Sequence, residues 1–398
     1  MIMQDNEKKP ALRFKGFTDP WEQRKFEEIA VRSSVMSDKK GLPRVEYEDI
    51  ISGAGRLNKD IKLKESEKVG IVFHKGDVLY GKLRPYLQNW LLASFNGLAV
   101  GDFWVLQPQN TDSSFLYRLV QSQQFDGVAN QSTGTKMPRA DWKLVSKTKF
   151  AMPHSVDEQA AIGAYFEHLD TLITLHQRKY EKLVNIKKSM LDKMFPKNGA
   201  SVPEIRFKGF TDLWEQRKVG ELLTERNEQA PMSDEYPLMA FIANEGVAPK
   251  GERYDRSALV NDTASKLYKK TKFGDFIYSS NNLETGSIGL NKYGKASISP
   301  VYSIFKPTGI ADSDFLGRRL IRKDFINEMV KWRQGVIYGQ WRIHESDFIK
   351  IEVTVPTVEE QYKLGLLLDN LDTLITLHRR KLEKLQNIKK SCLEKMFV

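Results

Sequence analysis

The sequence predicts an α+β protein in which two mixed α/β domains are separated by two long antiparallel coiled-coil helices, arranged as a pseudo-two-fold internal repeat. Three observations predict this fold class. A short segment occurs twice, a longer helix-like segment also occurs twice, and the stretches between the copies share little sequence. The 398 residues are enough for two domains with cores of their own.

The two repeats have different lengths and offsets. RFKGFTDPWEQRK at 13–25 and RFKGFTDLWEQRK at 206–218 agree at 12 of 13 positions. Residues 169–195 and 371–397 agree at 22 of 27 positions. The chain therefore reads as a short repeat, a variable segment and a long repeat, followed by the same three parts again.

The long repeat has the composition of a helix. From Asp157 to Phe195 it contains one glycine and no proline, and it is rich in Glu, Lys, Leu and Ala. Carboxylates occupy its first turn, where the helix dipole favours them, and Pro196 ends the first copy. The predicted domains are residues 1–156 (the first variable domain with its short repeat), 157–195 (central helix), 196–356 (the second variable domain) and 357–398 (C-terminal helix).

Apolar residues in both long repeats follow a heptad, which predicts that the helices pair through a coiled-coil interface. The seam residues are Ile162, Phe166, Leu169, Ile173, His176, Tyr180 and Leu183 in the first copy, and Leu364, Leu368, Leu371, Ile375, His378, Leu382 and Leu385 in the second. In an antiparallel pair, His176 and His378 would lie close together as a polar layer that fixes the register. Further apolar positions widen the stripe, which predicts an additional covering surface. Alternatively, each helix belongs to the core of its own domain.

The variable segments share a faint skeleton. Gly76–Tyr80 matches Gly274–Tyr278, and a second glycine-led loop, 134–139 in one segment, corresponds to 335–342 in the other. Loops that diverge on a shared scaffold are candidate recognition elements, with Lys and Arg suited to phosphates or guanine, and Asn and Gln to adenine. The candidate DNA-binding residues are Lys82, Arg84, Tyr86, Lys136, Arg139, Asn281, Asn282, Arg333, Tyr338, Gln340 and Arg342. The alternative is that these residues form solvated turns.

The composition narrows the class of partner. Sixty-two Lys and Arg against 51 Asp and Glu leave a net charge of +11, which favours a polyanionic partner such as nucleic acid. Apolar runs are too short for a membrane span, and the N-terminal residues do not resemble a signal peptide. The single cysteine, Cys392, suits a reducing compartment, so we expect a cytoplasmic protein.

The sequence contains no convincing catalytic or metal-binding motif. It lacks the Asn-Pro-Pro-aromatic segment typical of amino-methyltransferases, and its nearest phosphate-loop candidate, Gly246–Gly251, continues into Glu252-Arg253. The six histidines are scattered, without a cysteine or carboxylate set at metal-ligand spacing. We therefore expect no catalytic residues, no metal and no cofactor on this chain.

Taken together, these motifs resemble the DNA-specificity subunits of type I restriction–modification enzymes. The resemblance covers the whole chain and rests on the doubled FKGFTDxWEQR segments, the paired Pro/Glu-Gln helix starts (153–159 and 356–361) and the two Leu-Asp-x-Leu-Ile helices. It implies that the variable domains are target-recognition domains, each of which reads one half of a bipartite site in double-stranded DNA.

The resemblance also implies the partners. Two modification subunits that bind S-adenosylmethionine and methylate adenine N6 would dock on the helices, and restriction subunits that use ATP and Mg²⁺ would join them. This chain itself would catalyse nothing. Two alternatives are a free-standing DNA-binding regulator and an enzyme such as a nuclease; the surplus apolar helix face disfavours the first and the missing motifs disfavour the second.

Overall fold

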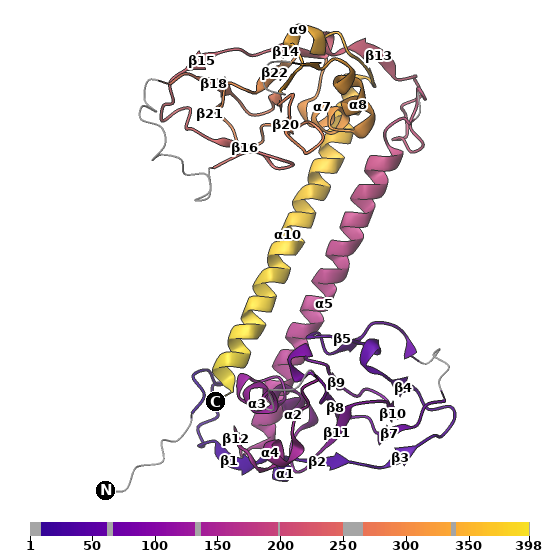
Figure 1. Ribbon diagram of the computed structural model, residues 1–398, viewed down its shortest axis with the longest axis vertical. Coiled ribbons are helices and arrows are strands. Elements are labelled where there is room, and N and C mark those ends of the chain that lie inside the picture. The colour runs from indigo at the N-terminus through magenta and orange to yellow at the C-terminus, as the bar shows by residue number, and fades with distance from the viewer. Residues whose placement is uncertain are drawn as a thin grey trace. The chain divides into compact units, whose positions relative to one another are not determined.

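The computed structural model describes residues 9–61, 67–131, 137–197, 200–249, 266–335 and 340–397. The chain forms two compact units, of which the first combines the chain up to Lys179 with the residues from His378 onward. The second unit runs from Tyr180 to Leu377. Each unit therefore contains one variable segment and a piece of both long helices (Figure 1). The four sequence-based domain boundaries stay a prediction.

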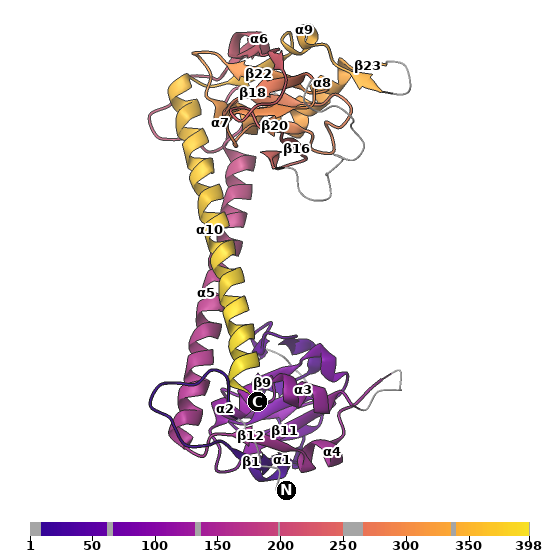
Figure 2. The same cartoon turned by 90° about the vertical axis from the view of Figure 1, so that its left-hand side faces the viewer.

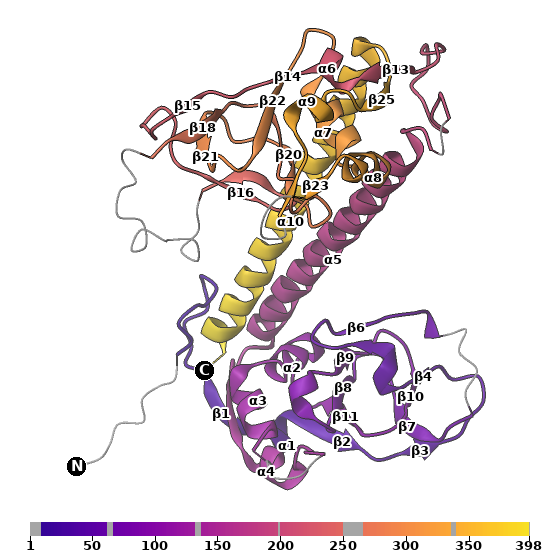
Figure 3. The ribbon, with the colours of Figure 1, turned by 45° about the horizontal axis from the view of Figure 1, so that its top comes forward.

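The first unit places short strands and helices around two sheets. In chain order its elements are β1 (Glu22–Lys25), α1 (Phe26–Ile29), β2 (Ala30–Ser33), β3 (Met36–Ser37), β4 (Arg44–Val45), β5 (Ile50–Ile51), β6 (Arg56–Leu57), β7 (Gly70–Phe73), β8 (Val78–Gly81), β9 (Trp90–Leu92), β10 (Gly97–Ala99), β11 (Phe103–Pro108), α2 (Ser113–Leu119), α3 (Gln123–Ala129), α4 (Trp142–Lys147), β12 (Lys149–Met152) and the start of α5 (Val156–Lys193). Helix α2 packs on the antiparallel sheet β2-β11-β8-β9. The second sheet, β3-β7-β10-β4, lies on the side away from α2 and α3 (Figure 3).

The second unit repeats the first sheet with different residues. In chain order its elements are β13 (Glu215–Lys218), α6 (Val219–Leu222), β14 (Leu223–Glu225), β15 (Gln229–Ala230), β16 (Ala240–Ile242), β17 (Gly246–Ala248), β18 (Tyr268–Thr271), β19 (Phe276–Tyr278), β20 (Ile288–Leu290), β21 (Ala296–Ile298), β22 (Ser303–Pro307), α7 (Ser313–Leu320), α8 (Lys323–Lys331), β23 (Gln334–Gly335), β24 (Trp341–Arg342), α9 (Glu345–Phe348), β25 (Glu352–Val355) and the start of α10 (Val358–Met396). The sheet β14-β22-β19-β20 has the strand order of β2-β11-β8-β9. Helix α7 packs against β20, as α2 packs against β9 (Figure 2).

The duplicated short segment forms a joint with the start of a long helix. In the first unit, Arg13 donates through Nε and Nη2 to the two carboxylate oxygens of Glu158, at 2.7 Å each. Trp21 Nε1 donates to the same carboxylate at 3.2 Å, and Glu158 is only 1% exposed. Arg206 binds Glu360 with the same two 2.7 Å contacts in the second unit. The repeat therefore supplies the partners that a buried carboxylate needs.

The glutamine that follows each of these carboxylates is also buried. Gln159 accepts a hydrogen bond from Asp112 N and donates one to Pro153 O, both at 2.9 Å. Gln361 makes the matching pair in the second unit, at 3.0 and 2.9 Å. One amide side chain thus satisfies a backbone donor and a backbone acceptor, which explains why the Glu-Gln pair occurs at both helix starts.

Further charged contacts join the helices within each unit. A carboxylate on one long helix binds a lysine of the other helix and an arginine of the variable domain. These triads are Asp170 with Lys389 (2.7 Å) and Arg118 (2.8 Å), and Asp372 with Lys187 (2.5 Å) and Arg318 (2.8 Å). Within the first unit, His176 Nδ1 lies 2.8 Å from His378 Nδ1, which confirms the expected proximity of these two histidines.

The predicted seam residues fall into two groups. Those near the start of each helix are buried in the apolar core of a unit: Ile162, Phe166 and Leu169 in the first, and Leu364, Leu368 and Leu371 in the second. The others lie farther along the helices, where Leu382 is buried and Ile173, Tyr180, Leu183, Ile375 and Leu385 are half-buried. The first group agrees with the interpretation of each helix as part of a domain core, while pairing of the helices through a coiled-coil seam stays a prediction.

Candidate nucleic-acid interface

The two divergent loops of the first unit lie next to each other. The loop that follows β8 and the segment before α4 are joined by two backbone hydrogen bonds, from Arg84 N to Pro138 O (2.7 Å) and from Ala140 N to Lys82 O (2.9 Å). Leu83 and Arg139 also form an isolated β-bridge. Candidate residues that are more than 50 positions apart in the sequence are thereby brought onto one surface.

A carboxylate lies between two of the candidate cations. Asp102 is 3.0 Å from Arg139 Nη2 and 3.6 Å from Lys82 Nζ. The hydrogen bond from Arg139 lowers the pKa of Asp102, so this carboxylate is charged at neutral pH. Tyr47 supports the cluster, since its hydroxyl donates to Asp102 O at 2.8 Å and accepts from Leu83 N at 2.9 Å. Sequence reasoning missed both Asp102 and Tyr47, because neither lies in a matched loop.

Arg84 and Tyr86 occupy a tight turn of this surface. Arg84 has a positive φ of 50°, in the left-handed region, and Pro85 follows it directly. Its Nε is buried without a hydrogen-bond partner among the residues that the structure describes. Tyr86 is 57% exposed and presents its ring to solvent. Lys136, the remaining candidate of this unit, lies outside the described residues.

In the second unit, Arg333 holds the loop that follows β19. Its Nη1 and Nη2 donate to the two carboxylate oxygens of Glu284, at 2.7 and 2.6 Å. Its Nε donates to Ser280 O at 3.1 Å. The pKa of Glu284 is lowered by the hydrogen bond from Arg333. This candidate DNA contact therefore has its guanidinium group engaged inside the protein.

Asn281 also uses a polar side-chain atom for a hydrogen bond within the protein. Its Oδ1 accepts from Trp341 N at 2.6 Å, while Ser280 Oγ accepts from Ile343 N at 2.9 Å. These bonds join the loop after β19 to the strand β24, just as the two loops of the first unit are joined. Asn282 is exposed, and in the described residues no hydrogen bond is made by its side-chain amide.

The remaining candidates of the second unit follow its second divergent loop. Gln340 and Arg342 are exposed, and Arg342 Nη2 is 3.7 Å from Glu345. Trp341 between them is 48% exposed and is not among the candidates selected from the sequence. Tyr338 lies outside the described residues.

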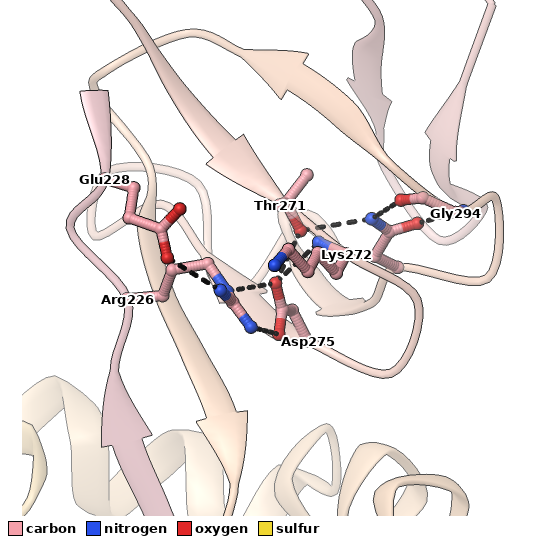
Figure 4. Close-up of polar contacts among 7 residues, drawn as sticks. Arg226, Glu228, Thr271, Lys272, Asp275 and Gly294 are labelled. Atoms are coloured by element: carbon pink, nitrogen blue, oxygen red, sulfur yellow. Dashed lines mark hydrogen bonds and ion pairs between the residues drawn. The ribbon is translucent and has the colours of Figure 1, made fainter. Parts of the chain in front are cut away.

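The turn before β19 contains a buried ion pair (Figure 4). Arg226 donates to both carboxylate oxygens of Asp275, at 2.8 and 3.2 Å. Asp275 also accepts from Thr271 Oγ1 (3.1 Å) and Lys272 N (2.7 Å). Burial raises the pKa of Asp275, against the opposing effect of these donors. Because β19 leads directly from this turn into the loop at 279–287, the ion pair helps to position that loop.

Within the described ranges, no three His, Cys, Asp or Glu side chains gather as a metal ion would need. None of the described helices is long and apolar enough to cross a membrane. The polar clusters of the two loop surfaces are therefore the best candidates for a functional site.

Comparison with known proteins agrees with the motifs. The family model described as "Type I restriction modification DNA specificity domain" matches residues 18–185. The chain is 25% identical over 127 residues to the type I restriction enzyme EcoDI specificity subunit of Escherichia coli, covering 31% of this chain and 28% of that protein. It is 23% identical over 284 residues to the MjaVIII specificity subunit of Methanocaldococcus jannaschii, covering 66% and 64%.

A solved structure shares the fold. The crystal structure of the type I restriction–modification S subunit from M. genitalium aligns with 98% of this chain and 99% of its own length, with a TM-score of 0.54 and 14% identity. Residues 18–185 thus resemble a DNA-specificity domain of the kind found in type I restriction–modification systems. The resemblance of the chain to specificity subunits of these systems is confirmed, while its matches span only 28% and 64% of the two relatives.

Proposed function

We propose that this chain is the DNA-specificity subunit of a type I restriction–modification enzyme. Each unit reads one half of a bipartite site in double-stranded DNA, and the chain directs modification and restriction subunits to that site without catalysis of its own. S-adenosylmethionine, ATP and Mg²⁺ act on those partner subunits. The proposal includes the cytoplasmic location that the sequence predicts.

The observation that carries this proposal is the recurrence of one surface with different side chains. The loop after β8 in the first unit and the loop after the equivalent strand β19 in the second are each hydrogen-bonded to a segment far along the chain. The first unit places lysine and arginine there, and the second places asparagines, a tryptophan and Arg342. A constant scaffold with variable side chains is what two readers of different DNA sequences require.

The long helices support the spacer role. In the first unit, Asp170 near the start of α5 contacts Lys389 near the end of α10. In the second unit, Lys187 near the end of α5 contacts Asp372 in the first half of α10. We therefore propose that α5 and α10 form an antiparallel coiled coil with pseudo-two-fold symmetry, which sets the length of unread DNA. Exposed leucines on these helices, such as Leu175 and Leu374, are suited to docking two modification subunits.

Co-expression with the modification subunit tests the proposal. Genomic DNA from cells with and without this chain would be mapped for N6-methyladenine. We expect a split motif that is methylated only when the chain is present. Exchange of residues 26–156 for the corresponding segment of another specificity subunit should change one half of the motif and leave the other half unchanged.

Two outcomes of this experiment would contradict the proposal. If a complex forms but methylation is absent, or its motif does not depend on this chain, the specificity role is wrong. Binding of a split site by the chain alone, without any complex, would favour a free-standing regulator instead.

A further inference from the structure

The loop at 279–287 of the second unit is fixed from several sides. Arg333 ties its beginning to its middle by donating to Ser280 O and to Glu284. Leu283 anchors the centre, since it is only 1% exposed and belongs to the apolar core. Gly286 closes the loop at a φ of +96°, where its carbonyl accepts from Asn244 N at 3.0 Å. A loop held in this way can present a side chain with little loss of entropy on binding.

The charges of this loop are also arranged so that they do not repel the phosphates of DNA. Glu284 is half exposed, and its carboxylate would repel phosphates if it stood alone. The two hydrogen bonds from Arg333 neutralise it and keep its pKa low. Arg333 therefore acts as a positioning residue, because the edge that could form a bidentate pair with guanine is already bound to Glu284.

Asn282 has the opposite arrangement, with a fixed backbone and an exposed side chain. Its carbonyl oxygen accepts from Ser287 N (2.9 Å) and from Thr285 Oγ1 (3.2 Å), and its N–H donates to Ser279 O (3.3 Å). Its neighbour Asn281 uses Oδ1 to accept from Trp341 N. Of the two adjacent amides, that of Asn282 is the one whose oxygen and nitrogen both have no hydrogen-bond partner among the described residues.

We propose that Asn282 is the adenine-reading residue of the second unit. An asparagine amide matches the major-groove edge of adenine, because Oδ1 accepts from the N6 amino group while Nδ2 donates to N7. This inference rests on the proposed function and deepens it. It assigns the base contact to Asn282, and the positioning of the loop to Asn281, Arg333 and Glu284.

The test uses the complete complex and its methylation motif. The half of the motif that survives exchange of residues 26–156 belongs to the second unit. Duplexes would then be prepared in which each adenine of that half is replaced in turn by 7-deazaadenine, which lacks the N7 acceptor. At one position we expect a loss of wild-type affinity of roughly fivefold to a hundredfold, the range for a bidentate base contact.

Three variants sharpen the measurement. Asn282→Ala should bind all duplexes without any penalty for 7-deazaadenine. Asn282→Asp has nearly the same shape but no donor, so it should disfavour adenine at that position and leave the other half of the motif unchanged. Asn370→Ala, an equivalent change at an exposed position of α10, should keep the wild-type pattern. Hydrogen-exchange protection of β19 and β22 at the wild-type level shows that the second unit of each variant is folded.

The outcomes separate the two proposals. A half-motif without a fixed adenine, or an Asn282→Ala complex with the wild-type pattern of penalties, overturns the adenine contact and leaves the specificity role intact. A chain that directs no methylation overturns both.

Discussion

The two units use the same sheet and the same joint, yet their loop surfaces differ in chemistry. In the first unit, Lys82 and Arg139 share the carboxylate of Asp102, so the cluster carries a net positive charge. In the second, Arg333 and Glu284 neutralise each other and amide side chains occupy the loop. The first surface is suited to phosphate or guanine, and the second to a neutral base edge.

The difference shows which parts of the chain are free to vary. The turn before the central strand has the same form in both units, with a glycine of positive φ followed by a buried aspartate that accepts from the backbone three residues earlier. Among the described residues, an arginine joins this turn in the second unit alone: Arg226 directly follows β14, and the matching position of the first unit is Ser33, the last residue of β2. Backbone geometry is retained, while the polar partners around it change.

The largest expected effect comes from breaking the joint. Glu158→Ala should reduce the stability of the first unit by about 3–5 kcal/mol, because it leaves the half-buried charge of Arg13 without a partner. Hydrogen exchange, followed amide by amide at the start of α5, measures this effect.

Glu360→Ala is the matched control, and its cost should be smaller by about 1 kcal/mol. Trp21 loses an acceptor in the first unit, whereas the buried Trp214 Nε1 has no hydrogen-bond partner among the described residues. Equal losses of protection in the two units would show that the tryptophan bond contributes nothing.

The next effect comes from making the second unit resemble the first. Arg226→Ser should destabilise the second unit by about 2–3 kcal/mol at neutral pH, because Asp275 remains buried with fewer donors. Burial already raises the pKa of Asp275, and loss of the arginine raises it further. A raised pKa favours the protonated carboxyl, so the variant should regain stability as the pH falls. Hydrogen exchange of β19 at several pH values measures the loss of stability in Arg226→Ser. A loss that does not depend on pH would contradict the role of the Asp275 carboxylate.

Sequence reasoning reached the helices more securely than the loops. The helix expected from Asp157 to Phe195 is observed as Val156–Lys193, because a 3.5-residue apolar period without breakers leaves few alternatives. The proximity of the two histidines followed from the same periodicity. The partners Asp102 and Glu284 could not be found in this way, since their contacts join loops that carry no period. Whether the candidate residues contact bases stays a prediction.

The histidine pair gives a smaller, pH-dependent effect. Burial, followed by neighbouring charges that include Lys179 and Lys381, lowers the pKa of both His176 and His378. Because the pKa of each histidine is lower in the folded state, the unfolded state binds more protons than the folded state as the pH falls. The stabilising contribution is therefore present above the ordinary histidine pKa of about 6.5 and is lost as the pH falls below it. Hydrogen exchange of the mid-helix amides, corrected for intrinsic rates, should show this loss.

His176→Leu should reduce this pH dependence and leave the protein folded, because His378 keeps the burial and the neighbouring lysines that lower its pKa. Because the polar layer that fixes the register is then missing, cysteine crosslinking between α5 and α10 should capture more than one alignment. A single alignment in the leucine variant would argue against the register role of the pair.

The smallest expected effect concerns the charge of the first loop surface. Asp102→Asn removes a carboxylate whose pKa is lowered by Arg139 and which is therefore charged at neutral pH. Lys82 and Arg139 then lose their shared counter-charge, so DNA affinity should rise and the slope of log K against log salt should steepen by about 0.9 for each phosphate gained. The methylated motif should stay the same, because phosphate contacts carry no sequence information. A changed base in the half read by the first unit would instead mean that Asp102 orients a base-reading arginine, and the two surfaces would then differ less than their charges indicate.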